Sequence, residues 1–129
     1  MGATSEHFSE AELACRHCGV NQCGEELVAA LEKLRAAVEK PVLIDDAYRC
    51  PAHNAEVGGA THSQHEEGAA ADIRVEGMTA RELYAAAAAT GAFRGFGVSE
   101  GEYIHVDIRA TPAKWCYDAQ GREIPWREA

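Results

Sequence analysis

The chain has 129 residues, of which 47% are hydrophobic, and this length and composition predict one globular domain over residues 1–129. Lys and Arg number 12 against 21 Asp and Glu, a net charge of −9, so we expect neither nucleic acid nor an anionic membrane surface as a partner. No stretch approaches the roughly 18 consecutive apolar residues that a membrane-spanning helix needs.

Three predicted elements occupy the first third of the chain. Ser9 and Glu12 have the spacing of a capping box, which predicts a short helix over residues 10–14. A second, amphipathic helix is indicated by apolar residues at helical spacing, which are Leu27, Val28, Leu31, Leu34 and Val38. That helix must end before Pro41, and the apolar residues 42–44 predict a buried strand directly after it.

A long polar segment, residues 45–68, follows this strand and interrupts the pattern of elements. Within it we expect one or two helical turns at residues 51–57. Loops of this length inside a compact domain are usually functional. The segment is therefore the first place to look for residues that bind or react with a ligand.

The second half of the chain adds one helix and several strands. A capping box formed by Thr79 and Glu82, with Gly91 as a stop signal, predicts a helix over residues 80–90. Strands are predicted at residues 71–75, 96–99 and 103–109, and the tail from 112 to 126 has the pattern of a hairpin. This order predicts an α+β fold, a small antiparallel sheet with helices packed on one face.

Alternation along two strands gathers potential metal ligands on one face. If the apolar faces of strands 71–75 and 103–109 both enter the core, Asp72 and His105 project together from the opposite face. His65, seven residues before Asp72, can fold back to supply a third ligand. Two histidines and a carboxylate, completed by water, form the ligand set of a catalytic zinc site. Such a site activates water for hydrolysis at neutral pH.

Several sequence blocks resemble the zinc D-Ala-D-Ala carboxypeptidase family. The most specific block is Ser63-x-His65-x-x-Gly68-x-Ala70-x-Asp72. The other blocks are Ala47-Tyr48-Arg49-Cys50-Pro51-x-His53-Asn54, Val57-Gly58-Gly59-Ala60 and Glu102-Tyr103-Ile104-His105-Val106-Asp107. The resemblance covers roughly residues 8–115. It implies the fold that these enzymes share with hedgehog signalling domains, and cleavage of peptidoglycan peptides.

The resemblance also implies roles for individual residues. The positions that match zinc ligands are those of His65, Asp72 and His105. Arg49 matches an arginine that polarises the scissile carbonyl and steadies the tetrahedral intermediate, although it could instead form a salt bridge with Asp45 or Asp46. Ser63 matches a serine near the substrate, and we assign Tyr48 to substrate binding with it.

Two acidic residues compete for the role of general base. Glu102, three residues before His105, matches the base of the family. Strand alternation places Glu102 on the face opposite His105, unless the turn at Gly101 rotates the backbone. Asp107 lies on the same face as His105, so it is either the rival base or the partner that orients the His105 ring.

Four of the five cysteines form a separate cluster in the sequence. Cys15-x-x-Cys18-x4-Cys23, with Cys50 further along, has spacing that occurs in structural zinc sites. His17 or His53 could replace one thiolate. Disulfides and buried thiols are the alternatives, although the odd number of cysteines and the lack of a secretion signal argue against a purely disulfide framework.

Two functions therefore remain. The first is a monomeric zinc peptidase that cleaves peptidoglycan stem peptides, as a D-Ala-D-Ala carboxypeptidase or an L-Ala-D-Glu-type endopeptidase. The second is a non-catalytic, zinc-containing binding module of the hedgehog type. Residues 1–15 show no signal peptide, so we expect synthesis in the cytoplasm. Action at the cell wall would then follow release by a phage or a non-standard export route.

Overall fold

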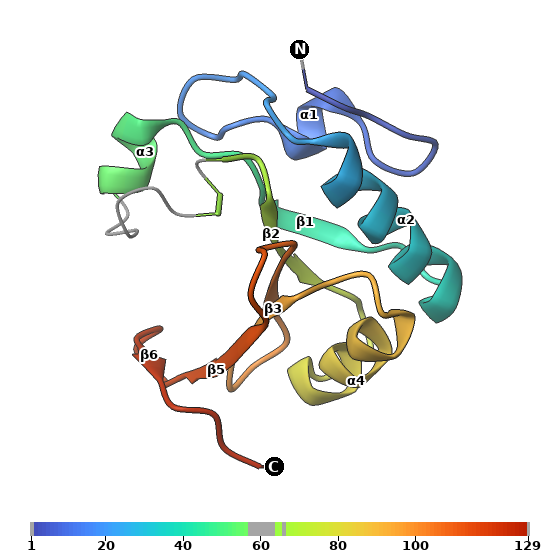
Figure 1. Cartoon of the computed structure of the whole chain (residues 1–129), viewed down its shortest axis with the longest axis vertical. Helices are drawn as coiled ribbons and strands as arrows, with labels where there is room; N and C mark the ends of the chain where they lie inside the picture. Colours follow the sequence, from blue (N-terminus) through green and yellow to red (C-terminus); the bar gives the residue numbers. More distant parts are fainter. Residues whose placement is uncertain (1, 57–63, 66, 129) are drawn as a thin grey trace.

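The computed structural model describes residues 2–56, 64, 65 and 67–128 (Figure 1). In chain order the elements are α1 (Glu10–Leu13), α2 (Glu25–Val38), β1 (Leu43–Asp46), α3 (Pro51–Glu56), β2 (Ala70–Arg74), α4 (Ala80–Thr90), β3 (Gly95–Val98), β4 (Ile104–Asp107), β5 (Ala113–Tyr117) and β6 (Glu123–Ile124). Every helix and strand predicted from the sequence is present, with ends that differ by at most two residues.

Local sequence signals explain where the helices begin and end. The side chains of Ser9 and Thr79 each accept a hydrogen bond from the backbone N–H three residues ahead, and the Glu carboxylate at that position accepts one from the backbone N–H of the cap residue. Gly91 ends α4 in the left-handed conformation with φ of 69°. Glu39 adopts the same conformation after α2, with φ of 55°, and its N–H donates to the Arg35 carbonyl.

The six strands form one mixed sheet in the order β1-β2-β4-β3-β5-β6. All neighbours are antiparallel except β3 and β5, which run parallel. The prediction of an antiparallel sheet is therefore wrong at this pair. After β4 the chain passes the end of β3 and joins its open edge, so the predicted tail hairpin of β5 and β6 extends the sheet.

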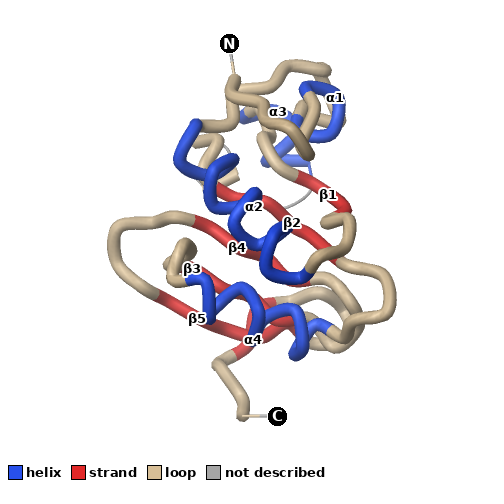
Figure 2. The backbone as a smooth tube through the Cα atoms, turned by 90° about the vertical axis from the view of Figure 1, so that its right-hand side faces the viewer, coloured by secondary structure: helices blue, strands red, loops and turns tan. Residues whose placement is uncertain are grey.

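The two longer helices cover one face of the sheet (Figure 2). Their buried leucines, among them Leu31 of α2 and Leu83 of α4, meet Ile73, Ile104 and Val106 from β2 and β4. Each such side chain contributes about 1.5–3 kcal/mol when it is removed from water. Because this face takes the apolar side chains, the opposite face carries the polar residues of β2 and β4.

In the part of the chain that the structure describes, no helix combines the length and the apolar character required to cross a membrane.

Candidate metal centre

Asp72 and His105 lie directly opposite each other on neighbouring strands. β2 and β4 pair antiparallel, and the register joins Asp72 to His105 and Ile73 to Ile104. Since successive side chains of a strand alternate between faces, Ile73 and Ile104 enter the core while Asp72 and His105 project from the face opposite the helices. This register agrees with the shared face expected from strand alternation.

His65 reaches the same point from the turn that precedes β2. Gly68, with φ of 72°, reverses the chain between His65 and β2, and its N–H donates to the His65 carbonyl at 3.1 Å. A side chain at Gly68 would collide with the backbone of Gln22. Only glycine combines this conformation with so close an approach, so Gly68 fixes where His65 can lie.

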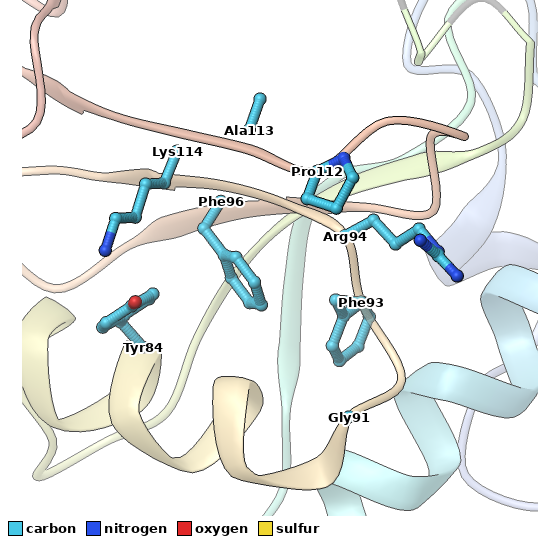
Figure 3. A pocket seen from close by; sticks show the side chains of 8 residues that line it. All are labelled: Tyr84, Gly91, Phe93, Arg94, Phe96, Pro112, Ala113 and Lys114. Carbon is cyan, nitrogen blue, oxygen red and sulfur yellow. The ribbon is translucent and has the colours of Figure 1, made fainter.

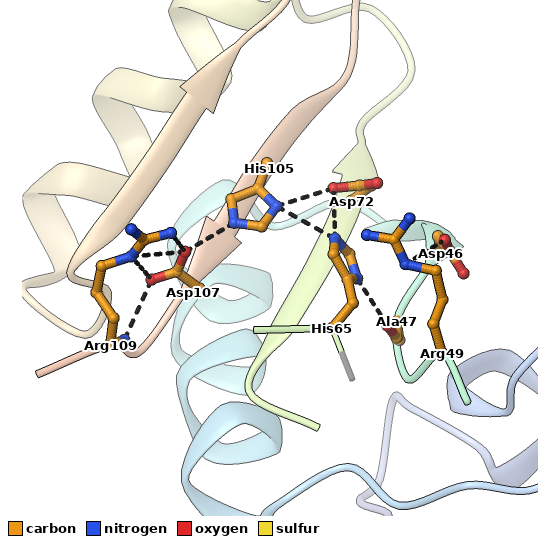
Figure 4. Close-up of polar contacts among 8 residues, drawn as sticks. All are labelled: Asp46, Ala47, Arg49, His65, Asp72, His105, Asp107 and Arg109. Carbon is orange, nitrogen blue, oxygen red and sulfur yellow. Dashed lines mark hydrogen bonds and ion pairs between the residues drawn. The ribbon is translucent and has the colours of Figure 1, made fainter. Parts of the chain in front are cut away.

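Three side-chain atoms converge on this face (Figure 4). His65 Nε2 lies 3.2 Å from Asp72 Oδ1 and 3.2 Å from His105 Nδ1, and these last two atoms are also 3.2 Å apart. His65 and His105 are buried, and Asp72 is partly exposed. The three residues, named below as the triad, therefore form one compact cluster that opens to solvent on the Asp72 side.

The outer nitrogen of each imidazole is held by an acceptor. His65 Nδ1 lies 2.7 Å from the Ala47 carbonyl oxygen, and His105 Nε2 lies 2.7 Å from Asp107 Oδ2. A carbonyl and a carboxylate accept hydrogen bonds, so these two nitrogens donate, and the inner nitrogens of the neutral rings present lone pairs. Two lone pairs and a carboxylate oxygen thus face one another, an arrangement that a cation would stabilise.

The spacing of the triad fits zinc. Zinc binds nitrogen and oxygen ligands at about 2.0–2.1 Å, so two ligands of a tetrahedral ion are about 3.3 Å apart. The observed separations are 3.2 Å. Three protein ligands leave the fourth tetrahedral position for water or substrate, which is typical of catalytic rather than structural zinc sites.

The electrostatics of the triad also favour a positive charge. Burial acts to raise the pKa of Asp72. When protons rather than a metal occupy the inner nitrogens, His105 and His65 donate hydrogen bonds to Asp72, which outweigh burial and hold this pKa well below its usual range. Burial acts to lower the pKa of His105, but the carboxylates of Asp107 and Asp72 outweigh it and raise this pKa. Both shifts have the same cause, which is that carboxylates and imidazoles in close contact favour a positive charge, a proton or a cation, between them.

Asp107 is occupied by two partners. It is fully buried and accepts hydrogen bonds from His105 Nε2 at 2.7 Å, Arg109 Nη2 at 2.6 Å and Arg109 Nε at 2.9 Å. Burial acts to raise its pKa, but these donors prevail and keep the pKa well below the usual range. With both oxygens engaged, Asp107 is placed to orient the His105 ring, which favours this alternative over the role of base.

A family model described as Peptidase M15 matches residues 6–107. The chain belongs to the Peptidase M15 family. No curated protein matches the chain. Membership confirms the resemblance drawn from the sequence blocks, and it supports a metallopeptidase with zinc as its metal. The match ends at Asp107, the last residue of β4, so β5 and β6 lie beyond it.

Two glycines of this M15 peptidase support the site, and sequence reasoning missed both. A β-carbon on Gly95 would collide with the Asp107 carboxylate. A β-carbon on Gly97 would come within 2.6 Å of both Trp115 Nε1 and Tyr117 Cε2. The signal was present in the sequence, because glycines two residues apart in a strand often mark a close approach by neighbouring groups.

Aromatic side chains of β5 form a wall beside the triad. The ring of Trp115 lies 5.2 Å from the ring of His105, and the Arg109 guanidinium lies 4.9 Å from the Trp115 ring centre. Tyr117 packs against Tyr103 at 5.7 Å. Burial raises the pKa of Tyr103, and the nearby Asp72 charge raises it further. This M15 peptidase therefore has an aromatic surface next to its candidate metal ligands.

Arg49 lies next to both His65 and Asp46. Its backbone N–H donates to the His65 carbonyl at 3.1 Å, and its Nε lies 3.4 Å from Asp46 Oδ2. The side chain is only 12% exposed. In Figure 4 the guanidinium lies on the same side as the triad. The ion pair with Asp46 considered from the sequence is present, while Asp45 pairs with Arg74 at 2.9 Å.

Two described residues with predicted roles remain, Tyr48 for substrate binding and Glu102 as general base. Tyr48 is partly buried and packs against the hydrophobic core. Glu102 is exposed in a bend just before β4, and among the described residues no member of the triad forms a hydrogen bond or ion pair with it. Ser63 and the block at residues 57–60 lie outside the described residues, so their predicted roles stay predictions.

Three of the four clustered cysteines meet in space. The sulfur atoms of Cys15, Cys18 and Cys50 lie within 4.8 Å of one another. Burial acts to raise the pKa of Cys15, but backbone N–H groups of Cys50, Cys18 and His17 outweigh it and lower the pKa to about 7. No disulfide joins any cysteine in the described chain. The side chain of His53, the other candidate donor, lies outside the described part.

The prediction that Cys23 belongs to this cluster is wrong. Cys23 packs within the hydrophobic core beside α2, with its sulfur 3.6 Å from the Leu13 carbonyl oxygen. Burial raises its pKa to about 11, so it remains a neutral thiol. The spacing along the sequence gave no warning, because whether Cys23 faces the core depends on contacts with residues far from it in the chain.

A cavity of about 540 Å³ lies between α4 and the strands β3 and β5 (Figure 3). Its side chains include Tyr84 of α4, Phe96 of β3 and Lys114 of β5. Phe96 alternates with Gly95 and Gly97, so it faces the helices, on the opposite face from the triad. The cavity therefore has no access to the candidate metal ligands.

Proposed function

We propose that the chain is a zinc-dependent peptidase that hydrolyses amide bonds in peptidoglycan stem peptides. The observation that carries the proposal is the triad, whose three inward-facing acceptors lie at zinc spacing in a member of the Peptidase M15 family. The proposed bond is either the one before a terminal D-alanine or one inside the stem peptide.

His65, Asp72 and His105 would hold the zinc ion. When bound there, zinc supplies a Lewis acid that activates water and polarises the carbonyl of the substrate. The Ala47 carbonyl and the Asp107 carboxylate keep the two imidazoles in the tautomers that turn lone pairs inward. The chain thus prepares the site before a metal arrives.

Arg49 and Glu102 are the proposed partners in the chemistry. Arg49 would donate hydrogen bonds to the carbonyl oxygen as negative charge develops on it, and its backbone contact with His65 keeps it beside the metal centre. Glu102 would take a proton from the attacking water and deliver it to the leaving amine. Its position three residues before His105 supports this assignment.

A non-catalytic binding module is the second candidate. One observation favours it, which is the exposed position of Glu102 without a described contact to the triad. In such a module the triad would hold zinc as a structural ion, and the aromatic wall of β5 would meet a protein partner. The two candidate functions therefore make different predictions. A peptidase should lose turnover when Glu102 is replaced, whereas a binding module should show no turnover at all.

The deciding experiment is mass spectrometry of purified peptidoglycan fragments incubated with the zinc-loaded protein. We expect loss of a terminal D-alanine or a cut inside the stem peptide, abolished in His65→Ala and strongly reduced in Glu102→Gln. Asp118→Asn, far along the tail, serves as the control and should cleave normally. Intact fragments after incubation with folded, zinc-loaded protein would reject the peptidase and favour the binding module.

A further inference from the structure

The cluster of Cys15, Cys18 and Cys50 joins two segments that are far apart in the sequence. Cys15 and Cys18 lie on the turn that follows α1, and Gly19 completes that turn with φ of 75°. Cys50 lies directly before α3. The three sulfur atoms lie within 4.8 Å of one another. One disulfide would use two of these thiols and leave the third unpaired, whereas one metal ion can bind all three.

Backbone N–H groups point at one of these sulfurs. The N–H groups of His17 and Cys50 both donate to Cys15 Sγ at 3.4 Å. Hydrogen bonds of this kind stabilise the thiolate form, which is the form that binds metals. Each of the two segments therefore places one N–H donor where it favours the thiolate form of Cys15.

A nitrogen donor lies beside the thiols. His17 Nδ1 is 3.5 Å from Cys50 Sγ, on the exposed side of the cluster. Three cysteines and one histidine, with two cysteines spaced Cys-x-x-Cys, make up one of the ligand sets of structural zinc sites. Zinc binds sulfur at about 2.3 Å, so thiolates around a tetrahedral ion are about 3.8 Å apart. The observed cluster would need to contract by no more than about 1 Å.

We propose that Cys15, Cys18 and Cys50, with His17 in the fourth position, bind a structural zinc ion separate from the triad. All four ligands come from the protein, so this ion has no open position for substrate. Cys23, which the sequence suggested as a ligand, is excluded by its place in the core.

The site would clamp the segment that orients the triad. Within residues 47–50, the Ala47 carbonyl accepts a hydrogen bond from His65 Nδ1, and the Arg49 N–H donates to the His65 carbonyl. The segment ends at Cys50, one of the proposed zinc ligands. The same segment contacts the N-terminal region through the Tyr48 N–H, which donates to the Leu13 carbonyl. A metal at Cys50 would fix the end of this segment that lies nearest to α3. The proposed zinc binding by the cysteine cluster does not depend on the peptidase function. Any effect of this zinc ion on turnover does rest on that proposed function.

Cobalt substitution of the full-length protein tests the proposal. Thiolate-bound Co²⁺ has a sulfur-to-metal charge-transfer band in the near ultraviolet, which the nitrogen and oxygen ligands of the triad cannot produce. We expect this band in the wild type, and two zinc equivalents per chain by elemental analysis. Absence of the band from folded, cobalt-loaded protein would overturn the proposal without any variant being made.

Variants separate this site from the triad. Cys18→Ser, at an exposed position, should weaken the band and bind the second zinc equivalent less tightly, whereas Asp72→Ala should lose one equivalent and keep the full band. Cys116→Ser changes a cysteine on β5 and should keep both metals. An unchanged band intensity and unchanged metal affinity in Cys18→Ser would overturn the assignment, as would a mass showing that two of the three thiols are joined by a disulfide.

The fourth ligand has its own test. His17→Ala should keep the charge-transfer band but bind Co²⁺ more weakly, because three thiolates remain. We expect an affinity loss of about tenfold or more. Unchanged affinity would overturn the assignment of His17 while leaving the three cysteines in place.

Discussion

The two candidate metal clusters of this chain are assembled in opposite ways. Two ligands of the triad lie on paired strands, where the hydrogen-bond register of β2 and β4 fixes Asp72 against His105. The thiols of Cys15, Cys18 and Cys50 lie on turns and loops, where backbone position depends on fewer hydrogen bonds. Ligands on strands keep their geometry without the ion, whereas ligands on loops can close around it.

The hydrogen-bond partners of the two clusters also differ, and those of the triad again restrict the ligands more. In the triad, a carbonyl and a buried carboxylate orient both imidazoles. At the cysteine cluster, two backbone N–H groups donate to the Cys15 sulfur, and these contacts do not fix the direction of a ligand lone pair. We infer from this difference that the triad suits chemistry at an open position, while the cysteine cluster suits a structural ion that links two segments of the chain. The predictions below test this contrast from the largest effect to the smallest.

Removing a triad ligand should have the largest effect. In Asp72→Ala we expect the triad to lose its metal and kcat/KM to fall by at least about 10³-fold, because bound zinc contributes several kcal/mol to the transition state. The cysteine cluster should keep its ion. Elemental analysis and a peptide-cleavage assay measure both. Asp45→Ala on neighbouring β1 is the control, and activity within tenfold of wild type in Asp72→Ala would contradict the assignment.

Arg49 should matter for turnover and not for metal content. Arg49→Gln removes the proposed donor to the developing oxyanion, so kcat should fall about 10²- to 10³-fold with zinc unchanged. Arg74→Gln is a matched control, since Arg74 also pairs with an aspartate but is more exposed. Equal effects of the two substitutions would show that Arg49 acts only through its ion pair with Asp46.

Asp107 should tune the triad rather than react. Asp107→Asn should weaken zinc binding about 10- to 100-fold, because the His105 ring loses its charged partner. Asp118→Asn, which breaks an exposed pair with Arg122, should leave zinc affinity unchanged. Full zinc affinity in Asp107→Asn would remove Asp107 from the metal centre.

Wild type and Asp107→Asn should also differ in how their stability responds to acid. The folded state lowers the pKa of Asp107, so its contribution to the free energy of unfolding is complete above about pH 4, near the pKa of an unfolded Asp. That contribution is lost as the pH falls toward the lower, folded pKa. Thermal melts of metal-free protein should therefore show the stability advantage of wild type over Asp107→Asn shrinking below about pH 4.

The smallest effect is steric and concerns Gly97, which packs directly against the aromatic side chains of β5. Gly97→Ala should lower the free energy of unfolding by about 1–3 kcal/mol, because the new methyl group meets Trp115 and Tyr117. Gly101→Ala is the control, since nothing lies within 4 Å of a β-carbon there, and it should change stability by less than about 0.5 kcal/mol. Denaturant melts measure both, and equal stabilities would contradict the close packing.

The positions of Asp72 and His105 on one face could be predicted because a strand has a period of two. Apolar residues on one side of each strand required the polar residues to share the other. The helix over residues 80–90 could be predicted because its capping box and its terminal glycine are local signals. In each of these cases the decisive interaction lies within a few residues of the chain.

Other features depend on contacts between distant residues. Nothing near residues 113–117 in the sequence specifies that β5 pairs parallel to β3, because the open edge of β3 exists only after the sheet has formed. Cys23 has the same spacing from its neighbours whether it faces the core or a metal. Similarly, Gly95 is required by Asp107, which is twelve residues away in sequence and adjacent across the β3–β4 pair.

The place of β3 between β4 and β5 also sets an order of assembly. The β3–β4 pair forms across a short turn, whereas β5 must close a longer loop before it can pair with the far edge of β3. Until then that edge, with its small glycines, has unpaired backbone groups that invite other strands. We therefore expect β5 and β6 to pair late in folding, and their pairing covers an edge at which other strands could otherwise add.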